Sequence, residues 1–202
     1  MEGLAHDHIL VDKHTAYDPI ALLRGFEVAH LDRPAHASDD SDASTVKPLR
    51  GDALPAPIRG LLDHPRDMTS TLQTFFGEVP TLRVMAHRRN GTWLERHVQL
   101  LGRDSEAVLE VGAIRIFLDR FPFVARVAIL EGERPLGGIL ADEAIAHRSH
   151  PQGFFRLDAS AHLAAELGFT PRATTLYGRH NELIGDSGLL AEVVEVLPPI
   201  DV

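Results

Sequence analysis

The 202-residue sequence contains no cysteine, and it has only one tryptophan and two tyrosines. The absence of cysteine excludes disulfide bonds, thiolate metal sites and a cysteine nucleophile. Lysine is nearly absent as well, because Lys13 and Lys47 are the only lysines. The cations available to hold a carboxylate are therefore almost all arginines, whose planar guanidinium can bind both oxygens of a carboxylate.

The sequence also lacks a long apolar run and a basic segment. No stretch approaches the ~20 apolar residues that a membrane-spanning helix needs. Glu2, Asp7 and His8 interrupt the N-terminal stretch where a signal peptide would have its apolar core. The net charge is −9, and the scattered basic residues do not form a duplex-binding face. We therefore expect a soluble, cytoplasmic protein with no membrane span and no nucleic-acid partner.

Motifs for common cofactors are missing too. The sequence has no phosphate-binding loop, no dinucleotide-binding glycine motif, and no Gly-x-Ser-x-Gly or His-Glu-x-x-His motif. The N-terminal histidines have no accompanying frame of Cys or Glu, so we interpret them as solvated side chains; they are His6, His8, His14, His30 and His36. We predict neither a metal nor a cofactor, so the chemistry of any site must come from arginine, glutamate and backbone groups.

Hydrophobic residues make up 44% of the chain, which is enough for one domain with a buried core. Residues 32–50 are rich in Asp, Ser, Ala and Pro and poor in large apolar side chains, a composition typical of a flexible linker. We therefore predict a partly flexible N-terminal extension over residues 1–50 and one compact domain over residues 51–202.

Within that domain, hydrophobic spacing predicts two early helices, over residues 54–63 and 67–76. Asp67 is a good N-cap for the second helix, and Gly77 suits the position just after its end. Further short helices are expected over residues 121–130, 139–144 and 159–167. Pro135, Leu136 and the two glycines that follow are expected to form a turn.

Three strands with short turns follow the early helices, and Asn90-Gly91 is a strong hairpin signal between the first two. A later strand is expected to bend at Pro151 and Gly153, and the chain ends in a hairpin around a Gly-Asp-Ser-Gly turn. Because the strands pair in hairpins and not through helical crossovers, the fold class is α+β, with a single, mainly antiparallel sheet of about six strands and short helices.

The last strand carries two glutamates, Glu192 and Glu195, among apolar residues. An acid in such a strand costs free energy unless it has a partner. The two positions have opposite parity, so in a regular strand they point to opposite faces of the sheet. Only one of the two can therefore face a pocket.

Five segments, in this order, resemble the chorismate lyase family, whose members remove pyruvate from chorismate to give 4-hydroxybenzoate. They are LPAPIRGLLDHPRDMT from Leu54, WLERHVQLL from Trp93, RPLGGIL from Arg134, LYGRHNEL from Leu176 and LLAEVVEVLPP from Leu189. The resemblance covers about 145 residues, from Leu54 to Pro199, and implies a chorismate lyase-like fold. It has no counterpart in the first fifty residues.

The resemblance implies a role for six residues. Arg96 falls on the arginine that binds a carboxylate, and Glu195 on a glutamate that contacts the ring hydroxyl; both would be catalytic. The substrate-binding residues would be Arg96, Leu136, Gly137, Arg179 and Met68. The expected partners are chorismate and an aromatic acid product, used in ubiquinone synthesis or other aromatic acid metabolism.

The residues alone leave other interpretations open. Arg96 could face solvent or pair with Glu110 on the next strand, and Arg179 could pair with Glu182. The family has a second arginine where this chain has His180. We therefore expect a carbon–oxygen lyase that needs no cofactor, and we keep two alternatives. One is a non-catalytic domain that binds a small aromatic acid, and the other is a member of the family that has lost its activity.

Overall fold

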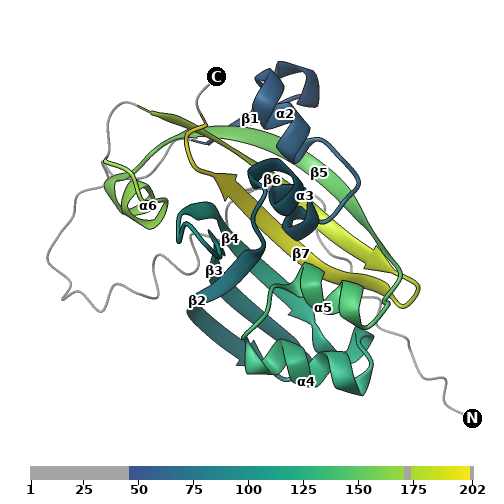
Figure 1. The fold of residues 1–202 in the computed structure, drawn as a ribbon. Helices are drawn as coiled ribbons and strands as arrows, with labels where there is room; N and C mark the ends of the chain where they lie inside the picture. The colour runs from purple at the N-terminus through teal and green to yellow at the C-terminus, as the bar shows by residue number, and fades with distance from the viewer. Residues whose placement is uncertain (1–45, 171–173, 201–202) are drawn as a thin grey trace, which may run out of the picture.

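The computed structural model of the protein describes residues 46–170 and 174–200. These residues contain one seven-stranded sheet in the order β1-β5-β6-β7-β4-β3-β2, and every neighbouring pair is antiparallel (Figure 1). The predicted α+β class with a single antiparallel sheet is therefore confirmed. The strand that sequence patterning missed is β1 (Val46–Leu49), which pairs with β5 (His147–Asp158) at one edge.

Two groups of hairpins build the rest of the sheet. The predicted meander consists of β2 (Pro80–Asn90), β3 (Trp93–Gly102) and β4 (Val108–Phe117). The final hairpin consists of β6 (Thr175–Gly185) and β7 (Gly188–Leu197). Because β7 pairs with β4, the last strand of the chain lies in the middle of the sheet and joins the two groups.

The helices are short. They are α2 (Ala56–Leu62), α3 (Met68–Phe76), α4 (Phe123–Glu131), α5 (Leu136–Asp142) and α6 (Ala161–Glu166), with 3-10 turns at Gly51–Ala53 and Leu118–Arg120.

Helix α3 begins and ends where local chemistry predicts. The Asp67 side chain accepts a hydrogen bond from the backbone N–H of Ser70, and Gly77 ends the helix at φ 73°. Helix α5 differs from the prediction, because Pro135 caps it and Leu136 is its first residue, where a plain turn was expected. Proline fits this position since it fixes the backbone angle and needs no hydrogen-bond partner for its nitrogen.

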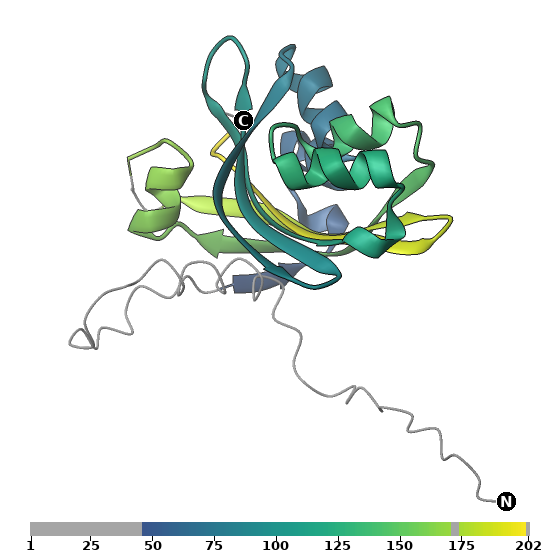
Figure 2. The ribbon, with the colours of Figure 1, turned by 90° about the horizontal axis from the view of Figure 1, so that it is seen from below.

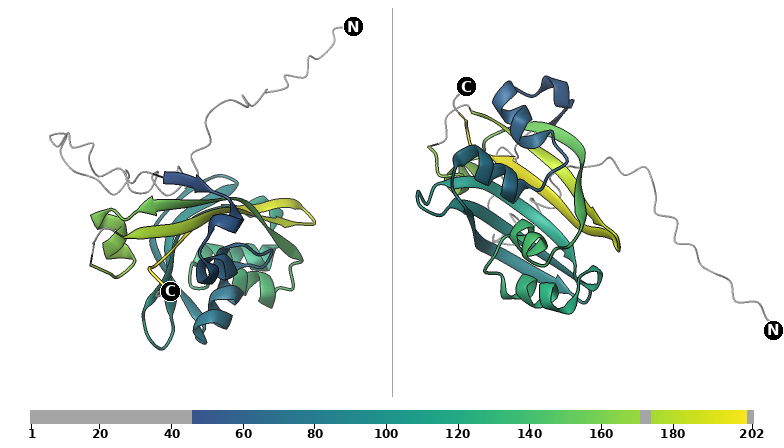
Figure 3. Two further views of the ribbon diagram at one scale, coloured as in Figure 1. Left: turned by 90° about the horizontal axis from the view of Figure 1, so that it is seen from above. Right: turned by 45° about the vertical axis from the view of Figure 1, so that its right-hand side comes forward.

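The sheet curves around the helices α3, α4 and α5 (Figures 2 and 3). On this inner face, α4 and α5 pack on Ile114 and Ile116 of β4 in one hydrophobic cluster, and α2 and α3 pack around Leu100 in another. Helix α6 packs against Val111 and Ala113, which alternate with the inner positions and therefore face outward. The two clusters on the inner face are called the α4–α5 cluster and the α2–α3 cluster below.

One domain boundary differs from the sequence prediction. Strand β1 includes residues that we assigned to the N-terminal extension, so the sheet begins before residue 51. The N-terminal histidines and residues 1–45 lie outside the described residues. On α4, Phe123 is 72% exposed, whereas Phe121 and Phe155 are buried.

Gly178 on β6 lies so close to Phe155 and to the backbone of Glu195 that a side chain has no room at this position. A Cβ at this position would lie 2.5 Å from Cζ of Phe155, well inside van der Waals contact, and it would also overlap the backbone oxygen of Glu195. We expect Gly178→Ala to lower the free energy of unfolding by about 3 kcal/mol or more, as overpacked sites do. Gly153→Ala is the matched control, since a Cβ there meets nothing within 4 Å. Chemical denaturation of both variants measures the difference, and equal stabilities would contradict it.

Candidate functional site

A cavity of about 70 Å³ lies between the inner face of the sheet and the N-terminal ends of α3 and α5. Its walls come from β2, β3, β4, β6 and β7, and most of the lining is apolar. The polar and glycine residues that line it are Asp67, Thr69, Arg96, Glu110, Gly112, Gly137 and Glu195. Met68 and Leu136 line it as well. Five of the six residues that the sequence singled out therefore surround one cavity.

Arg96 is the cation of this cavity. Its side chain projects from β3, it is only 4% exposed, and its guanidinium lies beside Gly132 at the end of α4. Burial lowers the pKa of the Arg96 guanidinium to about 10, so the group is charged at neutral pH. Arg96 makes no hydrogen bond or ion pair with any residue in the part of the chain that the structure describes. The predicted alternative of a salt bridge to Glu110 is wrong, because Arg96 lies opposite Ile114 and Glu110 opposite Leu100.

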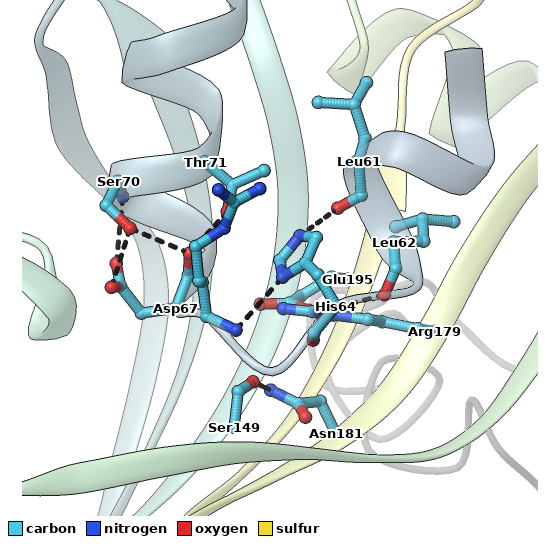
Figure 4. Close-up of polar contacts among 11 residues, drawn as sticks. Leu61, Leu62, His64, Asp67, Ser70, Thr71, Ser149, Arg179, Asn181 and Glu195 are labelled. Carbon is cyan, nitrogen blue, oxygen red and sulfur yellow. Dashed lines mark hydrogen bonds and ion pairs between the residues drawn. The ribbon is translucent and has the colours of Figure 1, made fainter. Parts of the chain in front are cut away.

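Arg179 and Glu195 form a buried ion pair across β6 and β7 (Figure 4). Arg179 Nη1 also donates hydrogen bonds to the backbone oxygens of Leu62, at 2.9 Å, and His64, at 3.4 Å. Arg179 does not line the cavity, and its partner is Glu195 and not the predicted Glu182, which instead lies beside Gln152. The pair therefore ties the final hairpin to the loop between α2 and α3.

The loop around this pair is held by further hydrogen bonds (Figure 4). His64 Nε2 lies 2.6 Å from the oxygen of Leu61, and its Nδ1 accepts from the backbone N–H of Arg66. Burial, followed by the positive charge of Arg179, lowers the pKa of the His64 imidazole, so this histidine is neutral. Nearby, Asn181 donates a 2.6 Å hydrogen bond to Ser149.

The two glutamates of β7 occupy different environments. Glu195 faces the cavity, whereas Glu192 accepts a 3.0 Å hydrogen bond from Arg115 on β4. Arg115 also pairs with the fully buried Glu95, so it belongs to an ionic network that does not include any cavity residue. The opposite parity of positions 192 and 195 explains this separation.

Gly137, in the first turn of α5, leaves space for the residues at the start of α3. A Cβ at this position would lie 2.6 Å from Oδ1 of Asp67 and 2.7 Å from Oγ1 of Thr69. The missing side chain therefore lets α5 approach the first turn of α3. Met68 and Leu136 begin these two helices, so both line the cavity from above.

Sequence reasoning missed Glu110 and Gly112 as site residues. Glu110 is 3% exposed, and burial, together with the negative charge of Glu195, raises the pKa of its carboxyl well above the ordinary value of 4.5. Arg179 opposes this shift but is a smaller influence. A signal was present in the sequence: Glu110 and Gly112 stand at alternate positions of an otherwise apolar strand, as a polar site on one face requires.

No protein-family model matches the sequence. No curated protein matches it either. Among solved structures, the effector domain of PhnF from Mycobacterium smegmatis is similar to 66% of this chain and 88% of its own length, with a TM-score of 0.51 and 15% identity.

Two further structures are similar. The whole PhnF chain matches with a TM-score of 0.49 and 14% identity over 65% of this chain, and the match spans only 63% of PhnF. The ligand-binding domain of a putative GntR-family transcriptional regulator from Bordetella bronchiseptica matches with a TM-score of 0.45 and 14% identity, over 58% of this chain and 85% of its own.

These comparisons confirm the fold and correct the predicted activity. The shared architecture is the chorismate lyase-like fold, which we expected from the resemblance. The solved domain that matches with a TM-score above 0.5 is named as an effector domain and not as an enzyme. The prediction that the protein is a carbon–oxygen lyase acting on chorismate is therefore wrong.

Two other predictions concern partners. None of the helices in residues 46–170 and 174–200 is long and apolar enough to cross a membrane. The same residues hold no cluster of three metal-ligating side chains. The expectation of no nucleic-acid partner stays a prediction.

The buried ion pair supports a prediction on stability. Glu195→Ala should lower the free energy of unfolding by about 3–5 kcal/mol, because it leaves the Arg179 guanidinium buried without its counter-ion. The single variants Glu195→Leu and Arg179→Met should each lose stability in the same way, and the double variant, which removes both charges, should be clearly more stable than the sum of these two losses predicts. Denaturant unfolding of the four proteins measures this coupling. Additive losses would contradict a direct interaction.

Glu110 supports a prediction on pH dependence. Above about pH 4.5, Glu110 loses its proton in the unfolded chain but keeps it in the folded protein. The free energy of unfolding therefore decreases as the pH rises from about 4.5 to the raised pKa of Glu110. Glu110→Gln cannot titrate, while Glu195 and Arg179, which face this position, stay unchanged. The melting temperature of Glu110→Gln relative to the unsubstituted protein should therefore increase between pH 4.5 and 7.5.

The difference between the two melting temperatures should grow with pH, because the pKa of Glu110 in the folded protein is raised. Differential scanning calorimetry at several pH values measures it. A difference between the two melting temperatures that is constant with pH would show that Glu110 does not titrate as described.

Proposed function

We propose that this protein is a small-molecule-sensing domain that binds a small carboxylic acid, with an aromatic acid such as 4-hydroxybenzoate as the leading class, and releases it unchanged. The observation that carries this proposal is the Arg96 guanidinium. It is charged and almost fully buried, it belongs to a residue that lines the cavity, and it has no counter-ion among the described residues.

An anionic ligand would offset the cost of burying the Arg96 charge. A buried charge without a partner costs several kcal/mol, and this cost is recovered when an anion enters the cavity and accepts charge-assisted hydrogen bonds. Arginine suits a carboxylate in particular, because the guanidinium and the carboxylate are both planar and can form two parallel hydrogen bonds. The apolar lining contributed by residues such as Val98 and Ile114 would contact the rest of the ligand.

The size of the cavity limits the ligand. Its volume of about 70 Å³ is below the ~150 Å³ of an engineered cavity that holds benzene. A single ring therefore needs some outward movement of α3 or α5, and a larger ligand needs more. The likeness to the effector domain of PhnF supports a binding role, because that domain is named for its effector and shares the fold.

The direct test is binding to the full chain. We expect benzoate and 4-hydroxybenzoate to raise its melting temperature, by about 5–10 °C at a ligand concentration 100-fold above the dissociation constant. Mass spectrometry after incubation should recover each acid unaltered. Failure of both acids, and of short-chain carboxylic acids, to bind would overturn the proposed function.

The role of Arg96 has its own prediction. Arg96→Met should weaken carboxylate binding by roughly 10- to 100-fold, the loss expected for hydrogen bonds to a charged group. The same change should raise the stability of the ligand-free protein, because it removes an uncompensated buried charge. Arg103→Met, which removes a charge from an exposed turn, is the matched control and should change neither property. Equal affinities of the two variants, measured by calorimetry, would contradict the assignment.

A further inference from the structure

Glu110 stands at the end of the cavity away from Arg96. On β3 and β4, Arg96 lies opposite Ile114, and Glu110 lies opposite Leu100. These two cross-strand pairs are four residues, or about 13 Å, apart along the strands. The Arg96 guanidinium points toward Gly132 and the α4–α5 cluster, whereas Glu110 lies beside the α2–α3 cluster. The two polar groups therefore face the cavity from separate ends.

The carboxyl of Glu110 is buried and incompletely paired. Its Oε2 has no hydrogen-bond partner among the described residues, although the side chain lines the cavity. Arg179 compensates it only in part: its charge favours the ionised form of Glu110 less than burial and Glu195 oppose it, and its Nε and Nη1 bind Glu195 and the backbone oxygens of Leu62 and His64. A buried polar group left without a partner costs about 1–3 kcal/mol, so an occupant of the cavity that paired with it would recover that free energy.

The space around this carboxyl depends on Gly112. A Cβ at position 112 would lie 2.9 Å from Oε1 of Glu110 and 3.2 Å from the backbone oxygen of Val194. Gly112 also lies directly opposite Glu195 in the sheet. The missing side chain thus leaves room for the Glu110 carboxyl between β3 and β7, next to the carboxylate that is already neutralised by Arg179.

The charges in the cavity determine what Glu110 can do. Glu195 is paired, and burial next to it keeps Glu110 in its neutral, protonated form. A neutral carboxyl has an O–H group to donate, and an ionised one has none. Asp67, which also lines the cavity, caps the N-terminus of α3. With Glu110 neutral, Arg96 carries the one other uncompensated charge among the described residues that line the cavity.

We propose that Glu110 is a specificity-determining residue, which donates a hydrogen bond to an uncharged oxygen of the ligand while Arg96 binds the ligand's carboxylate. This inference rests on the proposed function and narrows its ligand class. The site selects a monoanion that carries an acceptor oxygen, such as a hydroxyl or carbonyl, at the end opposite its carboxylate. A second carboxylate at that end is disfavoured, because it would be buried where the described lining of the cavity offers no second cation.

Three probes that differ at one position test this selectivity by isothermal titration calorimetry on the full chain. 4-Hydroxybenzoate carries the acceptor oxygen, benzoate lacks it, and terephthalate replaces it with a second carboxylate. We expect 4-hydroxybenzoate to bind roughly 3- to 10-fold more tightly than benzoate, as one additional hydrogen bond provides. Terephthalate should bind at least about 10-fold more weakly than 4-hydroxybenzoate, because its second carboxylate would be buried without a cation.

Two variants assign the selectivity to Glu110. Glu110→Gln keeps an N–H donor in a side chain of nearly the same shape, and it should keep most of the preference for 4-hydroxybenzoate over benzoate. Glu110→Leu removes the donor, and the ratio of the two dissociation constants should fall to about 1. Circular dichroism and cooperative unfolding establish that both variants fold. The comparison of the three probes on the unsubstituted protein does not depend on either variant.

The outcomes separate this inference from the proposed function. If both monoanions bind in an Arg96-dependent manner but with equal affinity, or if Glu110→Leu keeps the preference, the role of Glu110 is overturned and the proposed function stands. Tighter binding of terephthalate than of 4-hydroxybenzoate would also overturn it. If none of the three probes binds the unsubstituted protein, both the proposed function and the role of Glu110 fail.

Discussion

The buried ion pair between Arg179 and Glu195 is the interaction on which the site depends. It crosses the final hairpin at its centre and reaches the loop between α2 and α3 through the backbone oxygens of Leu62 and His64. Without it, an acid and a base would each be buried alone, at a cost that a domain of ordinary stability could hardly bear. Because Glu195 is neutralised within the protein, Arg96 is left as the cation available to a ligand. The same pair leaves Glu110 without a cation of its own.

This distribution of charges argues for recognition and not for catalysis. Each buried group has a fixed assignment: Glu195 to Arg179, and Arg96 and Glu110 to opposite ends of the cavity. Such a distribution fits the proposed sensing role, since a sensing site must hold its ligand selectively and then release it.

Much of the fold could be predicted from the sequence, because it depends on local chemistry. Asp67 and Gly77 bound α3, and Asn90-Gly91 joins β2 to β3, as their backbone preferences dictate. Strand β1 could not be predicted, because four residues without strong patterning form a strand only by pairing with β5. The alternation of side chains along a strand correctly predicted that Glu192 and Glu195 lie on opposite faces of the sheet. The partner of Arg179 and the burial of Glu110 were missed, because both depend on which strands are neighbours across the sheet.

The arrangement of the inner face has a mechanical consequence. Helices α4 and α5 are anchored in one hydrophobic cluster and α2 and α3 in the other, while the cavity is lined by the first residues of both α3 and α5. A ligand in the cavity would therefore be a crosslink between two helical layers that are otherwise attached to the sheet separately. Occupancy would restrict the motion of one layer against the other, and amide hydrogen exchange in α3 and α5 would slow together.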